Sequence, residues 1–135
     1  MSTPIVGQFN TTPPTVGSGQ RTQIQTDDAG RLLVSGTSVV SDYETVAASQ
    51  TAQVLGPTGA TGDYLNGLLV IPATTSPGNV LLLDNATSIT VFAGGASSVS
   101  NLIPFYIPIL AKSVSGAWKV TTGLNVSVVA SGDFT

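Results

Sequence analysis

The carboxylates are the side chains of this chain best suited to chemistry, because the sequence contains no histidine and no cysteine. A glycosidase-like site needs two carboxylates at a fixed separation, one acting as an acid and the other as a base or nucleophile. The candidates for such a pair are Asp27, Asp28, Asp42, Glu44, Asp63 and Asp84. All except Glu44 lie in or beside predicted turns, where Asp commonly bonds the local backbone. We therefore expect turn-forming residues here and no catalytic pair.

Other kinds of site lack their residues. A Ser-His-Asp triad requires histidine, and thiolate sites and disulfides require cysteine. Lys112 and Lys119 could activate a serine, but neither stands in an SxxK pattern. The pair Asp27-Asp28 lacks the further oxygen ligands of a calcium loop, and no glycine-rich phosphate motif occurs. We predict that the chain is not an enzyme and uses no cofactor or metal.

The single tryptophan, Trp118, has two interpretations. It could be a core residue, or it could be a platform on which a sugar stacks. Trp118 and Val120 share one face of a predicted strand, which favours a position in the core.

Only 8% of the residues are charged, and the net charge is −3. Nucleic-acid binding needs several phosphate contacts from Lys or Arg, and the chain has four basic residues in all. We therefore expect no nucleic-acid partner. A surface this poor in charge is either wetted by Ser, Thr, Asn and Gln or covered by other protein, and this favours a component of an assembly.

Nothing near the start resembles a secretory signal, because MSTPIVGQF has neither a basic segment nor an apolar run. The longest apolar run, LIPFYIPILA (102–111), is too short for a membrane helix and contains two prolines. The expectation is a soluble protein that is made in the cytoplasm and has no membrane partner.

Residues 1–40 are predicted to form an extended arm followed by a β-hairpin over 20–35. The proline-rich start (1–17) fits either a disordered tail or an arm that is ordered by a partner. The segments 20–26 and 31–36 flank the turn DDAG, with Asp first and Gly where a positive φ is needed. A two-stranded ribbon is marginal alone, so its apolar residues must lie against something: Ile24, Leu32 and Val34.

Residues 41–135 are predicted to form a β-sandwich. Short strands separated by Gly/Pro turns are expected over 43–55, 64–73, 79–85, 88–94, 102–111, 117–122 and 125–131. No segment shows a helical period with caps. A single jelly-roll-like sandwich fits this pattern best, and an immunoglobulin-like sandwich is the alternative.

The run 102–111 is predicted to be an edge strand. Ile103, Phe105, Ile107 and Ile109 share the face expected to enter the core, and Leu102, Tyr106 and Leu110 share the other. Pro104 and Pro108 remove N–H donors from the same lateral edge, which indicates a sheet edge or a subunit border. The run LLL (81–83) is also apolar on both faces, which fits either a generous core or contacts between copies. Residues expected at such contacts are Leu82, Pro104, Tyr106 and Pro108.

The segment SGQRTQIQTDDAGRLLV (18–34) resembles an element that recurs in virion proteins of tailed bacteriophages. The segments YLNGLLVIPATTSPGNV, SITVFAGG and SGAWKVTTGLNVSVVASG are similar to later parts of the same small phage proteins. Within that group, the chain resembles the capsid decoration, or cement, proteins. The resemblance implies a jelly-roll-like domain that assembles as a homodimer or homotrimer and binds the outer surface of the phage head, made in the bacterial host cytoplasm.

The implied function is to bridge subunits of the major capsid protein and so stabilise the head. We expect residues 1–40 to make most of the capsid contact, through Arg21, Ile24, Arg31, Leu32 and Val34. The alternative is a head-fibre or tail-fibre module that binds a host cell-surface glycan or receptor through the loops 56–62 and 94–101.

Overall fold

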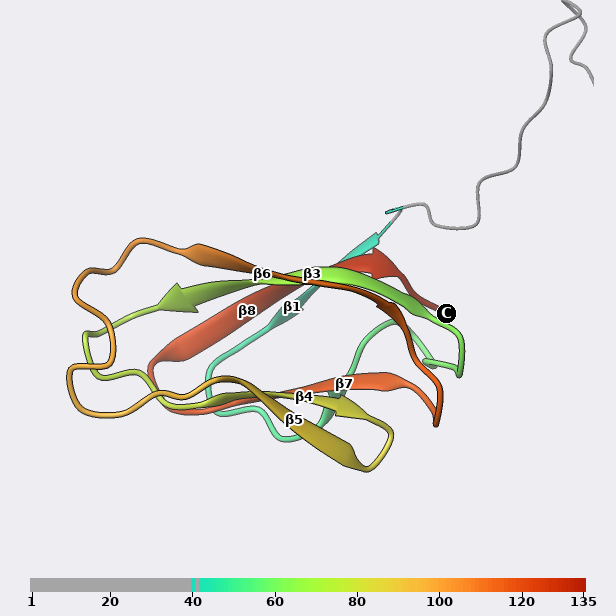
Figure 1. Ribbon diagram of the computed structural model, residues 1–135, viewed down its shortest axis with the longest axis horizontal. Helices are drawn as coiled ribbons and strands as arrows, with labels where there is room; N and C mark the ends of the chain where they lie inside the picture. The colour runs from blue at the N-terminus through green and yellow to red at the C-terminus, as the bar shows by residue number, and fades with distance from the viewer. Residues whose placement is uncertain (1–39, 41) are drawn as a thin grey trace, which may run out of the picture. The chain divides into compact units, whose positions relative to one another are not determined.

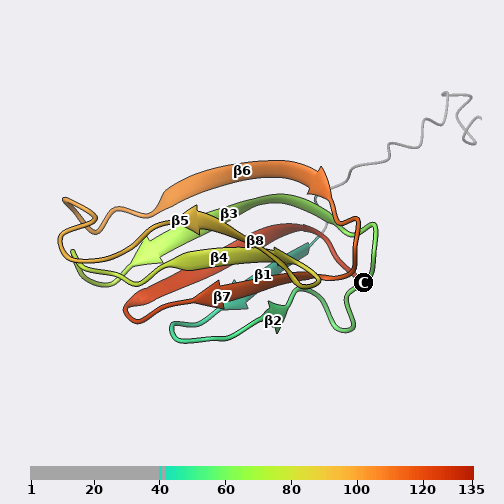
Figure 2. The same ribbon diagram turned by 60° about the horizontal axis from the view of Figure 1, so that its bottom comes forward.

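The computed structural model describes Val40 and residues 42–135, which form eight β-strands and no helix. The strands are β1 (Asp42–Val46), β2 (Gln53–Val54), β3 (Tyr64–Pro72), β4 (Val80–Asp84), β5 (Thr87–Phe92), β6 (Phe105–Lys112), β7 (Trp118–Thr122) and β8 (Val126–Asp133). They build two four-stranded antiparallel sheets with the orders β1-β8-β3-β6 and β2-β7-β4-β5. Figures 1 and 2 show these sheets stacked as two layers, which confirms the predicted β-sandwich.

The strand pairing is that of a jelly roll. β1 pairs with β8, β2 with β7, β3 with β6 and β4 with β5. One long antiparallel hairpin produces these pairs when it folds over, because successive pairs then fall alternately in the two sheets. The pairings of β3 with β8 and of β4 with β7 complete each sheet. In an immunoglobulin sandwich the first two strands share a sheet, whereas here β1 and β2 lie in different sheets.

The core lies between the sheets and is built from alternate residues of the central strands. In β8 the buried side chains are Val126, Val128 and Ala130, and those between them are half-buried. Strands β3, β4 and β7 repeat this pattern with leucine, valine and Trp118. A period of two is the side-chain period of a strand with one face inward, so the alternation in the sequence sets the register of each sheet.

The expected strand over 43–55 is instead two strands, one in each sheet, joined by a corner. At this corner the Thr122 hydroxyl donates to the Ala47 carbonyl at 2.6 Å and accepts from the Gln50 N–H at 3.0 Å. The neighbouring Thr121 hydroxyl accepts from the Ala52 N–H at 2.8 Å. These threonine side chains take the place of ladder bonds, so the chain leaves one sheet and enters the other.

Strand β6 is a sheet edge, as predicted from the two prolines of 102–111, although only Pro108 lies within the strand. It begins at Phe105, three residues later than expected, because Asn101 Oδ1 accepts from the Ile103 N–H at 3.1 Å and holds a local turn. Ile103 is consequently 67% exposed and does not enter the core, contrary to prediction. Phe105, Ile107 and Ile109 do pack against the core and are partly buried.

Candidate functional site

The Asp63 carboxylate, which was considered for a catalytic pair, holds the C-terminus. Its Oδ2 accepts from the Ala60 N–H at 2.9 Å and from the Thr135 N–H at 3.3 Å, and its Oδ1 accepts from the Thr135 hydroxyl at 3.0 Å. Asp63 is 5% exposed. The carboxylate thus accepts from three donors, one in the loop before β3 and two in Thr135. These bonds join the loop to the end of the chain.

The Asp84 carboxylate holds the loop between β6 and β7. It accepts from the backbone N–H groups of Val114, Ser115 and Gly116 at 3.0 to 3.2 Å. Loss of solvent acts to raise the pKa of Asp84, but the three N–H donors favour the charged form and outweigh it. The pKa of Asp84 therefore lies below its ordinary value. Both aspartates act on turns, as the sequence predicts.

No group of three or more acidic side chains within the described part of the chain is placed to hold a metal ion. Within that same part, no helix could cross a membrane. Asp27 and Asp28 lie outside the described residues, so the expectation for them stays a prediction.

Trp118 is a core residue, as its strand parity predicts. Its side chain is 5% exposed, and its Nε1–H donates to the Asp63 carbonyl at 2.9 Å. A sugar needs an open ring face on which to stack, and a side chain buried this far offers none. The interpretation of Trp118 as a sugar platform is therefore wrong.

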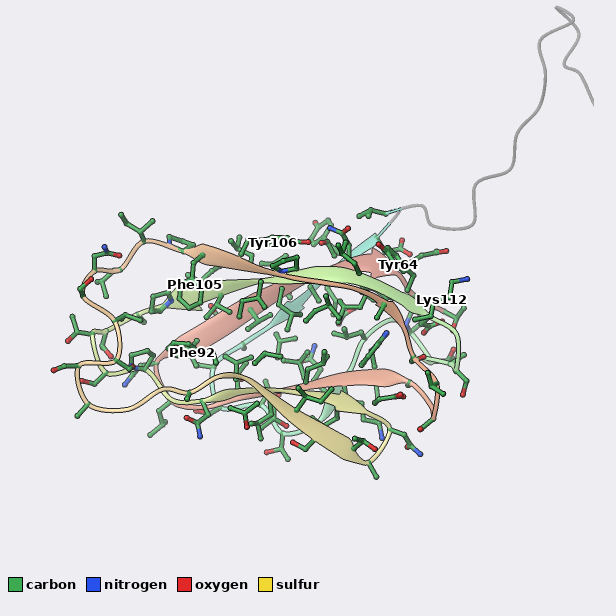
Figure 3. All side chains as sticks on the ribbon, in the orientation of Figure 1. Tyr64, Phe92, Phe105, Tyr106 and Lys112 are labelled. Carbon is green, nitrogen blue, oxygen red and sulfur yellow. The ribbon has the colours of Figure 1, made fainter. Side chains whose placement is uncertain are left out.

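The side of the sheet β1-β8-β3-β6 that points away from the core is broad and carries charge only at one end; we call it the outer face. Register places Tyr106, Leu69, Val129 and Thr45 in one row across the four strands. The next row is Pro108, Gly67, Ser131 and Tyr43. The only charged row of the outer face is formed by Lys112, Tyr64 and Asp133. Figure 3 shows Lys112 and Tyr64 at one end of the sheet.

Tyr106 lies across Gly67 at the centre of the outer face. Asn66 Nδ2 donates to the Tyr106 hydroxyl, and a Cβ at position 67 would meet the Tyr106 ring and the Ile107 carbonyl. Only glycine therefore allows the ring to lie flat on β3 at this point. Tyr106 is 46% exposed, so one side of its ring remains open.

The outer face also carries an irregularity next to Tyr106. The pairing of β3 with β6 shifts register between Leu65 and Gly67, and Leu110 adopts a φ of 56°. A positive φ is unfavourable for a branched side chain and is typical of a bulge. The bulge leaves the Leu110 side chain 63% exposed.

The residues expected at contacts between copies fall into different environments. Tyr106 and Pro108 lie on the outer face, and Pro104 is exposed just before β6. Leu82 is 1% exposed in the core and cannot touch a second copy, contrary to prediction. The outward side chains of its strand are the half-buried Leu81 and Leu83. The residues expected at the capsid contact, namely Arg21, Ile24, Arg31, Leu32 and Val34, lie outside the described residues.

The two loops considered for glycan binding lie at opposite ends of the sandwich (Figure 1). Loop 56–62 bonds the C-terminal residue and the loop after β6, through Gly59 N–H to Thr135 O at 2.6 Å and Gly62 N–H to Ser113 O at 3.0 Å. Loop 94–101 bonds the segment between β3 and β4, through Gly95 N–H to Pro77 O at 2.8 Å. A single small glycan therefore cannot contact both loops of one molecule.

The sequence alone did not predict the outer face, because its residues are far apart in the chain. Tyr43, Leu69 and Val129 become neighbours of Tyr106 only through the order of the four strands. The sequence feature that pointed to this face was the second apolar face of 102–111, which forms the outward side of β6.

Comparison of the chain with protein-family models, with curated proteins and with solved structures finds no match.

Proposed function

We propose that this chain is a decoration protein of a tailed-bacteriophage head. It is made in the host cytoplasm, binds the outer surface of the capsid and bridges major capsid protein subunits. The sequence resemblance of residues 18–34 and of three later segments to small phage virion proteins supports the phage context.

The uncharged central rows of the outer face are the observation that carries the proposal. These rows combine exposed Tyr43 and Tyr106 with half-buried Leu69 and Val129, and they contain no charged side chain. The exposed Leu110 lies beside them at the bulge of β6. Such a face loses little solvation of charge when other protein covers it. Covering about 400 Å² of apolar surface contributes at most about 10 kcal/mol, before the costs of ordering are subtracted.

The proposed mechanism is mechanical. A protein that spans neighbouring capsid subunits adds its own buried surface to the work of separating them. Because the same contact recurs around a symmetric shell, modest contacts sum to a large effect. Residues 1–40, with their predicted hairpin, supply the remaining contact with the capsid in this proposal.

Cosedimentation tests the proposal. The full chain is mixed with DNA-emptied heads of the phage that encodes it, and the bound chain is counted against the major capsid protein. We expect hundreds of copies per head and a higher melting temperature of decorated heads. Tyr106→Lys should weaken binding. Val114→Lys should not, because Val114 is 79% exposed in the loop after β6 and is not part of the outer face.

Two outcomes would count against decoration. No sedimentation with heads, together with binding to a glycan array, would identify the chain as a fibre module. A handful of copies per virion would indicate a fibre or a tail part.

A further inference from the structure

The four strands at the lateral edges of the sandwich are β1 and β6 in one sheet and β2 and β5 in the other. An edge strand presents unpaired backbone N–H and C=O groups to any other strand, so proteins usually block it. β6 is blocked by Pro108 and by the bulge at Leu110. β2 has only two residues, and β1 carries Asp42 and Glu44.

β5 is less protected, because its one irregularity is a register shift against β4 at Val91, near the end of the strand. Its sequence, TSITVF, contains no proline and no charge, and its β-branched and aromatic residues favour strands. The first four residues of β5, Thr87 to Thr90, are all exposed. Among the described strands, β5 is therefore the edge best suited to pair with another strand.

The core-facing side chains next to this edge are incompletely covered. Ile89 lies opposite the buried Leu82 in register, yet it is 46% exposed. Val91 and Phe92 on the same strand are only partly buried. The corresponding residues of β6 in the facing sheet are Phe105, Ile107 and Ile109, also partly buried.

The Phe92 and Phe105 rings connect the two sheets at this side of the sandwich. Their centroids lie 5.4 Å apart with an interplanar angle of 60° (Figure 3). We call the six side chains the β5–β6 seam: Ile89, Val91, Phe92, Phe105, Ile107 and Ile109. The seam contains no charged or polar side chain.

We propose that two copies of this chain associate through the β5–β6 seam, with β5 pairing antiparallel to β5 of the second copy. The sheet β2-β7-β4-β5 of one copy would then join the same sheet of the second copy into one continuous sheet of eight strands. Pro108 keeps β6 from forming a competing ladder. The proposal does not depend on the capsid function, because it rests on the edge strands alone.

A second copy is the occupant that this edge fits best. A two-fold axis normal to the sheet keeps each residue on its own face of the sheet, so a pairing centred on Ile89 brings the two Ile89 side chains together. Ser88 then lies opposite Thr90 of the second copy, and the regular pairing ends before the register shift at Val91. The two Ile89 side chains thus meet on the core side, and the hydroxyl side chains of Ser88 and Thr90 meet on the other side.

The seam is large enough for a specific dimer. β6 has eight residues, so the seam is about 27 Å long at about 3.4 Å per residue. The two sheets and their outward side chains give it a height of about 20 Å. About 540 Å² per copy, or about 1,100 Å² in total, exceeds the roughly 1,000 Å² that a specific interface needs.

A cysteine trap tests the pairing, since the natural chain has no cysteine. Directly opposed residues of an antiparallel pair have Cα atoms about 4.5–5.5 Å apart, within the range of a disulfide. The full-length I89C variant should form a covalent dimer quickly and nearly completely under oxidised glutathione. T45C is the matched control and should crosslink at least about tenfold more slowly, because Thr45 is exposed on β1, at the opposite edge of its sheet from β6. Equal rates for the two variants would overturn the proposed pairing.

Sedimentation velocity gives the second test. At about 100 μM, a dimer with a Kd of about 10 μM is mostly assembled. We expect the wild-type chain to be dimeric, I89K to be monomeric and T45K to remain dimeric, because Thr45 lies on β1 at the opposite edge. A monomeric wild type, or an I89K variant that still dimerises, would overturn the proposal.

S88K serves as a second variant if I89K fails to fold, because Ser88 is exposed and points away from the core. The two lysine side chains introduced at position 88 would be diagonal neighbours on the same face of the joined sheet, where their like charges repel, so S88K should also be monomeric. A dimeric S88K would count against the β5 pairing. If a wild-type monomer instead binds peptides with the sequence of β5, the edge accepts strands but does not pair with a second copy.

Discussion

Asp63 offers a direct test of how the loop before β3 and the C-terminus are held. Its carboxylate accepts from the backbone N–H groups of Ala60 and Thr135 and from the Thr135 hydroxyl. Asp63→Ala removes all of these bonds. Asp63→Asn keeps the shape, and its side-chain oxygen can take the position of Oδ2 and accept from both N–H groups. The Asn NH2 then faces the Thr135 hydroxyl, which can accept a hydrogen bond.

The expected magnitudes follow from this difference. A buried donor that loses its acceptor costs about 1–3 kcal/mol. Ala60 and Thr135 are exposed and can recruit water, so Asp63→Ala should cost about 2 kcal/mol for the two N–H groups together. At about 3–6 °C per kcal/mol for a chain of this size, Tm falls by about 6–12 °C. Asp63→Asn should cost about 1 kcal/mol or less, because it loses only the contribution of the charge.

Fluorescence of Trp118 is a suitable assay, because it is the only tryptophan and donates to the Asp63 carbonyl. Thermal unfolding of the wild type and both variants, followed at this residue, gives the three Tm values. Equal losses of Tm in Asp63→Asn and Asp63→Ala would show that the charge of Asp63, and not its hydrogen-bond geometry, controls the stability. A loss below about 2 °C for Asp63→Ala would refute the view that these bonds hold the loop.

Three further predictions concern the acid response, the corner and the N-terminal segment. Because the pKa of Asp84 is lowered, its ionised form stabilises the fold above the unfolded-state pKa, and this stability is lost as the pH falls through the lower folded-state value. Melting curves from about pH 7 to about pH 2 should therefore show a Tm loss below about pH 4 that is smaller in Asp84→Asn, and parallel curves would contradict this. Thr122→Val should cost about 1–3 kcal/mol in a urea titration, because the Gln50 N–H and the Ala47 carbonyl lose their partner; an unchanged midpoint would contradict the role of the hydroxyl. Deleting residues 1–36 should abolish capsid binding in cosedimentation and leave the circular dichroism of the β domain unchanged; full-strength binding of the shortened chain would contradict the expected role of the segment.

Most of the strands could be predicted from the sequence, because most lie between turns rich in glycine, proline or asparagine and alternate with a period of two. The corner between β1 and β2 could not. Val46 and Val54 have the same parity, so the alternation runs through the corner without a break. The bonds that divide the segment come from Thr121 and Thr122, which are about seventy residues further along the chain. Local periodicity contains no information about such distant partners.

The candidate surface was predictable only in part, for a similar reason. The parity of Tyr106 and Pro108 places them on one side of β6, and this much follows from the sequence. That Tyr106 lies across Gly67, and that the row continues to Leu69 and Val129, follows from strand order alone. The turn position of Asp84 was predicted, but its three N–H donors belong to a loop about thirty residues away.

The two proposed surfaces are geometrically compatible. A two-fold axis that pairs β5 with β5 runs normal to the sheets, so it turns the second copy without inverting it. The outer faces of both copies would then point in the same direction and lie side by side. A dimer of this kind would place two copies of Tyr106 and its neighbours on one supporting surface, where the second contact benefits from the first. I89K should therefore weaken capsid binding although Ile89 does not lie on the outer face, and Tyr106→Lys should weaken capsid binding without affecting the dimer.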